Sequence, residues 1–429
     1  MGKHISKILS STQQREINLS TEEEIKVIIK YWARILNIKL GWIQDFDRLV
    51  VKYVSSFVFL FNVKYLFATF FMFEMFRSSS KLIKTFTKHI DIVWSIDSTT
   101  FDNYQFICSG SDDSTVCVWN VMTNDQSQSF NEHSNNVFCV KFSQYYYQNH
   151  RRRVICSSSA DTTIRFWDFK HNQQFQIFNE HTGWVCGIEF SSFNGGRYLC
   201  SGSFDRTVRL WDVETSKSLH IFNGHENGVW CVDFSPLQNN NNDKKNNKSN
   251  SIGLIGGNGY TICSGSHDNT IRVWDIETAK QIIVFEGHKD WIKSVKYGSN
   301  ELGTNGGANT ILSGSADKSI CLWDIRSAQQ IQVFKGHTDC IWPVEYSPFV
   351  IDNIDVGGSS NVICSASDDD TIRFWDIRSN NNELYVIKGN DKRNVGIRSL
   401  KFLSLKNNAA YLCYGSIRGP VYVWGKSSS

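Results

Sequence analysis

The amino-acid sequence predicts an all-β protein that is built from repeated units of short strands. The stretch SGSFDRTVRLWD, residues 201–212, recurs in related copies that begin at residues 109, 157, 264, 313, 365 and 414. A catalytic constellation normally occurs once per domain, so a motif in seven copies indicates an architectural unit. Apolar and polar residues alternate within each copy and turn residues separate the runs, which is typical of four short strands per unit.

Each unit reads in the same order along the chain. A Gly-His pair such as Gly224-His225 comes first, and an alternating apolar run follows it. A Cys-Ser-Gly-Ser strand, a turn with Asp, a strand that ends in Trp and a final strand complete the unit. The repeated Trp residues stand at 119, 167, 211, 274, 323, 375 and 424. The widest spacing, from 211 to 274, contains an Asn/Lys-rich tract, which predicts a disordered insert at about 238–251.

The repeat resembles the WD-repeat family. The resemblance rests on Gly-His pairs at 224–225, 287–288 and 336–337, and on Trp-Asp pairs at 167–168, 211–212, 274–275, 323–324 and 375–376. It covers about residues 81–426 and implies a seven-bladed β-propeller of four-stranded blades around a central channel. We therefore expect an N-terminal region over 1–80 and the propeller over 81–429. Residues 81–89 are expected to supply the missing fourth strand of blade seven and thereby cover an open sheet edge.

The resemblance also implies that the repeated His, Ser, Asp and Trp residues form buried hydrogen-bonded tetrads. Such a set would satisfy a buried carboxylate and a buried indole, so its role would be structural and no catalytic residue is expected. The six matching sets are His89/Ser109/Asp113/Trp119, His133/Ser157/Asp161/Trp167, His181/Ser201/Asp205/Trp211, His225/Ser264/Asp268/Trp274, His288/Ser313/Asp317/Trp323 and His337/Ser365/Asp369/Trp375. Blade seven departs from the pattern with Asn390, Tyr414 and Arg418.

The composition of the chain limits the classes of protein to which it can belong. A hydrophobic content of 41% and an aromatic content of 14% provide for a large core, and a net charge of +3 is too small to indicate nucleic-acid binding. The 12 cysteines fall largely one per repeat without a CxxC pair, which predicts reduced core thiols and neither a zinc site nor another cofactor. With no secretory signal in the first residues, we expect a cytoplasmic or nuclear protein.

The long inserts are expected on one face of the propeller, the bottom, between first and second strands. They span 144–153, 237–259, 299–309 and 349–361. The first insert contains Arg151, Arg152 and Arg153, which we interpret as a solvated loop, with contact to nucleic acid as the alternative.

The resemblance to the WD-repeat family implies that the opposite face, the top, carries the loops that enter the first strands and the Asp turns. Five Trp residues outside the repeat motif are expected at the starts of first strands, around the channel mouth: Trp94, Trp184, Trp230, Trp291 and Trp342. The residues before the turn Asp join them there, among them Asp112, Phe204, His267 and Asp368. An aromatic ring with acidic neighbours would bind a partner peptide that carries Arg or Lys. The alternative is that the Trp side chains pack between blades.

A second candidate contact comes from two consecutive WDIR sequences, which contain Arg326 and Arg378. They resemble the signature of WD-repeat receptors that dock on the adaptors of cullin-RING ubiquitin ligases. The alternative is that each Arg pairs with a neighbouring carboxylate.

The first eighty residues show no repeat. Residues 20–23, STEE, fit a capping box that opens a helix, and the stretch 50–76 is long and apolar enough to allow a membrane span. Lys52 and Glu74 interrupt that stretch, which favours a helix packed on the propeller or on a partner. The start MGKHIS also fits a myristoylation template.

Together these observations predict a non-catalytic scaffold or adaptor that binds other proteins on the propeller top face. Two alternatives stay open: a substrate receptor of a cullin-RING ligase, and a membrane-associated adaptor that acts through residues 1–80. The sequence indicates neither the partners nor the oligomeric state.

Overall fold

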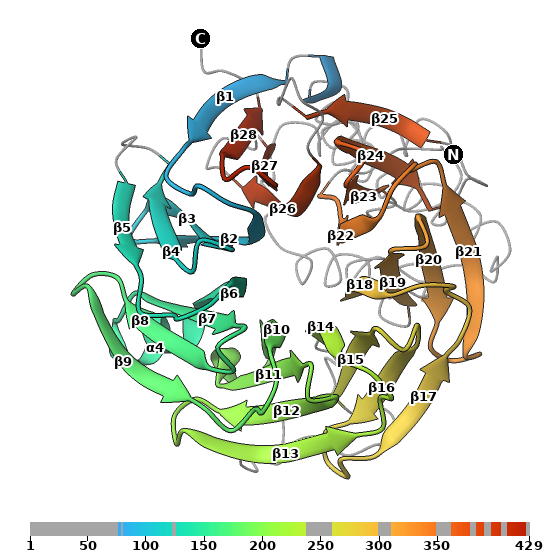
Figure 1. Cartoon of the computed structure of the whole chain (residues 1–429), viewed down its shortest axis with the longest axis horizontal. Helices are drawn as coiled ribbons and strands as arrows, with labels where there is room; N and C mark the ends of the chain where they lie inside the picture. The colour runs from blue at the N-terminus through green and yellow to red at the C-terminus, as the bar shows by residue number, and fades with distance from the viewer. Residues whose placement is uncertain are drawn as a thin grey trace, which may run out of the picture. The chain divides into compact units, whose positions relative to one another are not determined.

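The structure, a computed structural model, describes residues 76–78, 80–121, 126–236, 260–298, 310–348, 362–377, 383–389, 396–404 and 410–425. Within these ranges the chain forms seven antiparallel sheets of four strands each, arranged as blades around a central channel (Figure 1). The predicted fold class, a seven-bladed β-propeller, is confirmed. The N-terminal capping box, residues 50–75, the inserts 237–259, 299–309 and 349–361, and the side chains of Asn390 and Arg378 lie outside the described residues.

Each blade runs outward from the channel in chain order. Blade 1 contains β2 (Val93–Phe101), β3 (Tyr104–Ser111), β4 (Val116–Asn120) and β5 (Gln126–Phe130); blade 2 contains β6 (Val137–Ser143), β7 (Val154–Ser159), β8 (Ile164–Asp168) and β9 (Gln173–Phe178). Blade 3 contains β10 (Val185–Phe190), β11 (Tyr198–Ser203), β12 (Thr207–Asp212) and β13 (Lys217–Asn223); blade 4 contains β14 (Val229–Phe234), β15 (Thr261–Ser266), β16 (Ile271–Asp275) and β17 (Gln281–Phe285). Blade 5 contains β18 (Ile292–Tyr297), β19 (Thr310–Ser315), β20 (Ser319–Asp324) and β21 (Gln329–Lys335); blade 6 contains β22 (Ile341–Tyr346), β23 (Val362–Ser367), β24 (Thr371–Asp376) and β25 (Glu383–Lys388).

Blade 7 joins the two ends of the propeller. Its inner strands are β26 (Ile397–Ser404), β27 (Ala410–Ser416) and β28 (Val421–Gly425), and its outer strand is β1 (Lys81–Phe86). β1 pairs antiparallel with β28, so that Lys81 lies opposite Gly425 and Phe86 opposite Val421. In Figure 1 the blue β1 lies beside the red β28. Backbone hydrogen bonds between the first and last strands therefore close the ring.

Close packing between blades explains the small residues of the second strands. All six residues of β11 are buried, because this strand packs against the neighbouring blades. A Cβ atom added to Gly202 would lie 2.7 Å from Cγ1 of Val229 in blade 4. A larger residue in this position would push the two blades apart.

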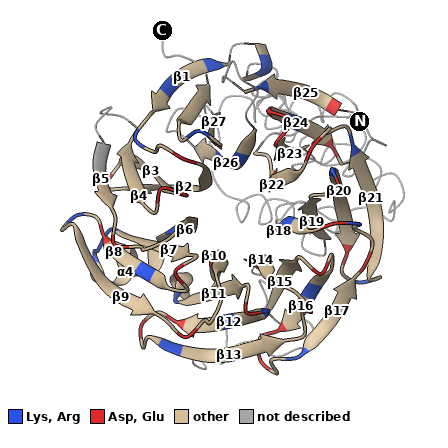
Figure 2. Cartoon of the chain, viewed as in Figure 1, with Lys and Arg blue, Asp and Glu red and all other residues tan. Residues whose placement is uncertain are grey.

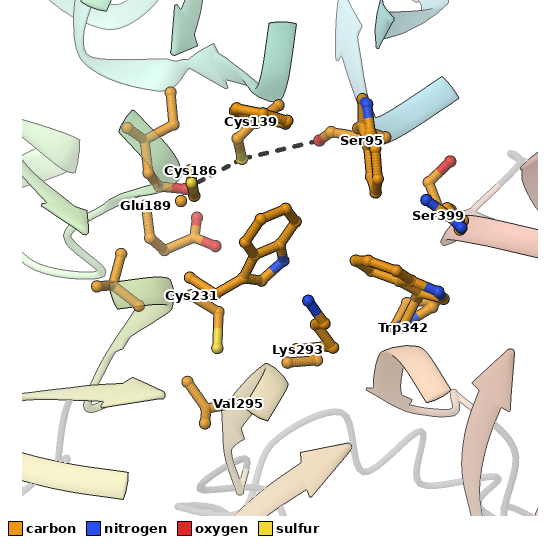
Figure 3. Close-up of a pocket in the computed structure, with 18 of the residues that line it drawn as sticks. Ser95, Cys139, Cys186, Glu189, Cys231, Lys293, Val295, Trp342 and Ser399 are labelled. Carbon is orange, nitrogen blue, oxygen red and sulfur yellow. Dashed lines mark hydrogen bonds between the residues drawn. The ribbon is translucent and has the colours of Figure 1, made fainter. Parts of the chain in front are cut away.

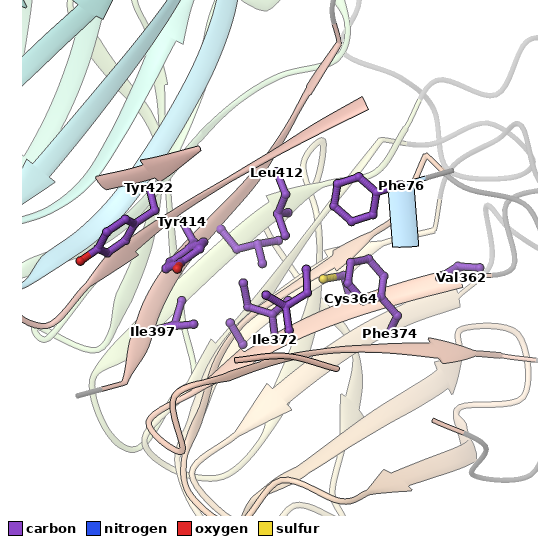
Figure 4. Packing of buried hydrophobic residues seen from close by; sticks show 12 residues of the cluster. Phe76, Val362, Cys364, Ile372, Phe374, Ile397, Leu412, Tyr414 and Tyr422 are labelled. Carbon is purple, nitrogen blue, oxygen red and sulfur yellow. The ribbon is translucent and has the colours of Figure 1, made fainter. Parts of the chain in front are cut away.

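The core consists of apolar clusters between neighbouring blades, as Figure 4 shows for blades 6 and 7. Here Ile372 and Phe374 of β24 pack with Leu412 and Tyr414 of β27. Phe76 joins this cluster at 4% exposure, with its ring centre 6.2 Å from that of Phe374. The packed part of the propeller therefore begins before β1.

The insert 144–153 differs from the predicted solvated loop. Its first part forms the helix α4 (Gln144–His150), and Tyr145 and Tyr146 of this helix are buried against blades 2 and 3. The three arginines follow the helix with their guanidinium groups over aromatic rings, Arg151 over Tyr147, Arg152 over Phe175 and Arg153 over Phe106. Arg153 also pairs with Asp102. The basic patch is thus folded onto the protein surface, and in Figure 2 basic and acidic segments mix around the ring.

Candidate functional site

The six tetrads fix the top face of the propeller. In blade 3, Nδ1 of His181 lies 2.6 Å from Oδ2 of Asp205, and its Nε2 lies 2.7 Å from Oγ of Ser201. The Trp211 indole N–H donates to the same Ser201 oxygen at 2.8 Å. Because the Asp carboxylate accepts from Nδ1–H, Nε2 of the imidazole accepts the Ser hydroxyl. Ser201 is fully buried, which fits a structural hydroxyl better than a nucleophile.

The other five sets repeat this geometry. Across all six, the His–Asp distances are 2.6–2.8 Å, the His–Ser distances 2.7–2.8 Å and the Trp–Ser distances 2.7–3.1 Å. Each tetrad ties a top loop to the second and third strands and to the turn between them. The loops of the top face are therefore held on a rigid frame.

The tetrad residues of blades 4 and 5 lie too deep to act as binding residues themselves. Ser264 and Ser313 are fully buried, at 0% exposure. Trp274 and Trp323 are 1% and 2% exposed, and their indole N–H groups donate to these two hydroxyls at 2.8 Å each. A partner could reach none of these four side chains without opening the blades. Their contribution to a site is therefore the support of the top loops above them.

The tetrads differ in one neighbouring side chain. In blade 2, Arg165 lies opposite Ser157 and brings its Nη2 to 3.8 Å from Asp161 Oδ2. Burial, helped by the charge of Arg165, lowers the pKa of His133 despite the bond to Asp161. In blades 1 and 5 the equivalent residues are Cys117 and Cys321.

The histidine of the blade 1 tetrad, His89, behaves differently from His133. Burial opposes protonation of His89, but the hydrogen bonds to Asp113 and Cys117 outweigh it and raise the pKa of His89 to about 9. Burial also opposes ionisation of Asp113, and the bonds from His89 and Thr115 lower the pKa of this carboxyl to about 2. The blade 1 tetrad is therefore an ion pair at neutral pH.

Blade 7 lacks the tetrad, as its sequence indicates. Tyr414 occupies the Ser position, is 1% exposed and packs on Tyr422 at 5.1 Å between ring centres. The Trp424 indole N–H is buried and makes no hydrogen bond to a described residue. This blade keeps the strand pairing but replaces the polar frame with aromatic packing.

The five predicted Trp residues occupy two different positions instead of one. Trp94, Trp230 and Trp342 each follow a tetrad His by five residues, whereas Trp184 and Trp291 follow theirs by three. A β-bulge begins every first strand, for example between Val93 and Ser95, and turns the residue inside it toward the channel. The five Trp residues therefore form two sets, and counting from each tetrad His in the sequence would have separated them.

The first group gathers at the channel mouth and narrows it. The ring centres of Trp94, Trp230 and Trp342 lie 5.1–5.8 Å from one another, although they come from blades 1, 4 and 6. With the equivalent residues of the other blades they form what we call the channel ring: Trp94, Phe138, Cys186, Trp230, Lys293, Trp342 and Arg398. Figure 3 looks into the channel, with Lys293 and Trp342 directed toward its middle. The lining residues surround a cavity of about 140 Å³.

Two cations of the protein already occupy the aromatic faces of the channel ring. The Lys293 Nζ lies 4.3, 4.8 and 4.5 Å from the ring centres of Trp230, Trp291 and Trp342. The Arg398 guanidinium lies over Trp94 and Trp342 at 4.7 and 4.4 Å. These contacts are the cation–π pairs that the sequence led us to expect from a partner.

The acidic residues near the mouth also have internal partners. Asp368 accepts two hydrogen bonds from Arg398, at 3.0 and 3.1 Å. Asp112 accepts a hydrogen bond from the Trp94 indole. The predicted residues are thus brought together around the channel, but the carboxylates bind the protein's own groups and do not favour a basic peptide.

An aromatic wall crosses blades 3 to 5 beside the channel ring. His267 stacks between Trp230 and Trp291, with ring centres at 5.5 and 4.1 Å, and Phe204 contacts Trp184 and His267 at 5.1 and 5.0 Å. Burial, together with the charge of Lys293, lowers the pKa of His267 to about 3, so this imidazole is neutral. Trp184 and Trp291 are each 46% exposed, in contrast to Trp342 at 9%. The wall therefore presents two indoles to solvent.

A second ring of seven equivalent residues lies deeper in the channel and was not foreseen. This charged ring consists of Asp97, Lys141, Glu189, Asp233, Lys296, Glu345 and Lys401. In the six blades with a tetrad, the charged residue follows the tetrad His by eight positions, which is the signal that could have found it.

The members of the charged ring pair with one another across blades. Lys141 lies 2.5 Å from Glu189, Lys296 lies 3.3 Å from Glu189, and Lys401 lies 3.5 Å from Asp97. Burial opposes ionisation of Glu189, but the two lysines beside it outweigh this and lower the pKa of Glu189 to about 2. Burial raises the pKa of Asp233 to about 6. The ring is a buried ionic network, and no cluster of metal-ligating side chains occurs among the described residues.

The remaining predicted sites are described only in part. Arg326 lies exposed in the turn between β20 and β21, where its backbone N–H donates to Asp324 Oδ1 at 3.2 Å, whereas Arg378 lies outside the described residues. No helix within the described ranges is long and apolar enough to span a bilayer.

Comparison with known protein families identifies the repeat. The family model described as WD domain, G-beta repeat matches residues 80–120, 124–168, 172–212, 216–275, 279–324 and 328–376. Each matched segment combines the outer strand of one blade with the three inner strands of the next, and each ends at or just after a tetrad Trp. Propellers of this family generally serve as non-catalytic scaffolds that bind other proteins. The matched segments cover more than half of the sequence, and the chain therefore belongs to the WD-repeat family.

Proposed function

We propose that this protein is a non-catalytic interaction scaffold that binds a partner protein on its top face, with Trp184 and Trp291 as anchors. The observation that carries the proposal is the exposure of these two indoles on the aromatic wall. A large aromatic side chain in solvent is costly unless a partner covers it, and Trp dominates the hot spots of protein interfaces.

The frame beneath the wall supports this role. His181 and His288 of two tetrads stand three residues before Trp184 and Trp291, so each anchor is held by a buried hydrogen-bond set. Ile90, which follows the tetrad residue His89, adds another apolar side chain at 84% exposure. A rigid apolar surface loses little conformational entropy when it binds.

Affinity capture from a native extract tests the proposal. The bait is the full chain, and the variant is Trp184→Ala/Trp291→Ala. The matched control is Ile282→Ala/Ile331→Ala, which removes two side chains of similar exposure, 48% and 54%, from the outer strands. We expect specific partners to disappear from the Trp variant and to remain with the control, provided that both variants melt as the wild type does. Partners that remain with the Trp variant would contradict the proposal.

The ligase-receptor and membrane-adaptor hypotheses stay predictions. The first depends on Arg326 and Arg378, of which Arg378 lies outside the described ranges. The second depends on residues 1–80, of which the structure describes 76–78 and 80.

A further inference from the structure

Lys293 has no anionic partner among the described residues, unlike the other cations of the channel. Arg398 in the same ring pairs with Asp368 through two bonds. In the charged ring, Lys141 and Lys296 reach Glu189, and Lys401 reaches Asp97. The polar contact of Lys293 is Nε2 of His267, at 3.1 Å, and that imidazole is neutral.

This unpaired ammonium is also removed from water. Lys293 is 7% exposed and its Nζ faces three indole rings. The cation–π contacts stabilise the ammonium only in part, because the burial of an ion without a counter-ion carries a large desolvation cost. A carboxylate that reached this ammonium would form a charge-assisted hydrogen bond in a medium of low dielectric constant.

We infer that the partner segment that enters the channel mouth carries a carboxylate group that pairs with the Lys293 ammonium. The inference rests on the proposed function and reverses the chemistry expected from the sequence, in which the partner supplied the cation. Lys293 borders both the space within the channel and the exposed Trp291, so a chain anchored on the aromatic wall lies next to it. The carboxylate comes either from an Asp or Glu side chain or from a free C-terminus.

Four pools of short fluorescent peptides with otherwise random neutral residues separate these cases. One pool carries a central Glu and an amidated C-terminus, one a free C-terminal carboxylate, one neither group, and one a central Lys with an amidated end. Fluorescence anisotropy measures the binding of each pool to the full chain. We expect one or both carboxylate pools to bind about tenfold more tightly than the neutral and Lys pools. The carboxylate pool that binds more tightly shows whether the carboxylate comes from a side chain or from a C-terminus.

Substitutions of Lys293 test whether this residue causes the preference for the carboxylate pools. Lys293→Met should remove the about tenfold preference, and Lys293→Arg, which keeps the charge, should retain it. Lys289→Met is the matched control, because Lys289 is an exposed lysine in the loop that leads into β18, the strand of Lys293. The carboxylate preference of this variant should be unchanged. If Lys293→Met does not fold, the Lys293→Arg variant and the pool comparison with the wild type still decide the question.

Three results would overturn the inference: equal binding of all pools, tightest binding of the Lys pool, or an unchanged preference in Lys293→Met. None of them affects the capture experiment with Trp184→Ala/Trp291→Ala. A scaffold that keeps its Trp-dependent partners but shows no carboxylate preference would retain the proposed function and lose this inference.

Discussion

At the scale of the residue, the side chains beside a buried tetrad influence its charge. Arg165 in blade 2, like Arg272 and Arg373 in other blades, lies 3.8–3.9 Å from a tetrad carboxylate. Blade 1 has Cys117 instead, and the pKa of His89 is raised to about 9. The neighbour at this position therefore contributes to the charge of the tetrad but does not set it alone, because blade 5 also has a cysteine there, Cys321.

We expect Cys117→Arg to lower the pKa of His89, because a second cation beside Asp113 would compete with the imidazolium. A histidine whose pKa is raised on folding adds stability that is fully present below pH 6.5 and is lost as the pH rises through about 9. The variant should therefore lose less stability than the wild type between these values. Imidazole NMR titration and urea unfolding at several pH values measure both effects.

The control for this prediction is Cys340→Arg, which adds the same charge in blade 6. It should leave the His89 titration unchanged. A His89 pKa that is the same in Cys117→Arg and in the wild type would show that the missing arginine is not the cause.

At the scale of the element, the sequence predicted the strands better than the segments that connect them. Strands repeat with the motif, and each alternates in the same way, so seven copies reinforce one pattern. The helix α4 was missed because seven residues are too few for a stable isolated helix. Packing of Tyr145 and Tyr146 between blades holds this helix, and such contacts are not visible in a local pattern.

The strand β1, which closes the ring, allows a test of how firmly a single strand is held in the propeller. Phe86 of β1 is 6% exposed and lies 4.8 Å from Trp119 between ring centres, as Phe178 of β9 lies 4.8 Å from Trp211. Loss of a buried Phe side chain costs about 3–5 kcal/mol. If β1 is held as firmly as an internal strand, Phe86→Ala and Phe178→Ala should lower the free energy of unfolding by similar amounts.

Urea unfolding followed by Trp fluorescence measures the two variants side by side. A much smaller loss for Phe86→Ala would mean that the ring opens at blade 7 before the other blades unfold. The aromatic packing that replaces the tetrad in blade 7 makes this the blade in which such weakness would appear.

At the scale of the whole molecule, the architecture could be predicted because each blade contacts only its neighbours and repeats one unit. The arrangement of the residues at the channel mouth could not be predicted, because it depends on contacts across the channel. Trp94 and Trp342 meet although 248 positions separate them, and Lys293 faces rings from blades 4, 5 and 6. The sequence indicated which aromatic residues gather at the mouth, but only the packed ring shows that the protein supplies its own cations.

The channel mouth should give the whole protein a pH response centred on Lys293. Burial lowers the pKa of Lys293 to about 8, and the charge of Arg398 acts in the same direction, against a smaller opposing effect of the Cys186 and Cys340 thiols. The other groups that face it are the Cys231 thiol and the neutral His267. A lysine whose pKa is lowered on folding binds fewer protons in the folded than in the unfolded chain between about pH 8 and 10.5, so this group makes stability rise with pH there.

Binding and stability should therefore respond in opposite directions. Affinity for the carboxylate peptide pools should fall as the pH rises through about 8, because Lys293 loses its charge, while the stability of the free protein gains from the same deprotonation. Each quantity is compared as the value for the wild type minus the value for Lys293→Met. The stabilising contribution of His89 also falls over part of this pH range, but it is the same in both proteins and cancels in the difference. Calorimetric melting and peptide anisotropy at matched pH values give the two curves. If neither the stability difference nor the affinity difference between wild type and Lys293→Met changes with pH, Lys293 keeps its proton over the whole range and this prediction is wrong.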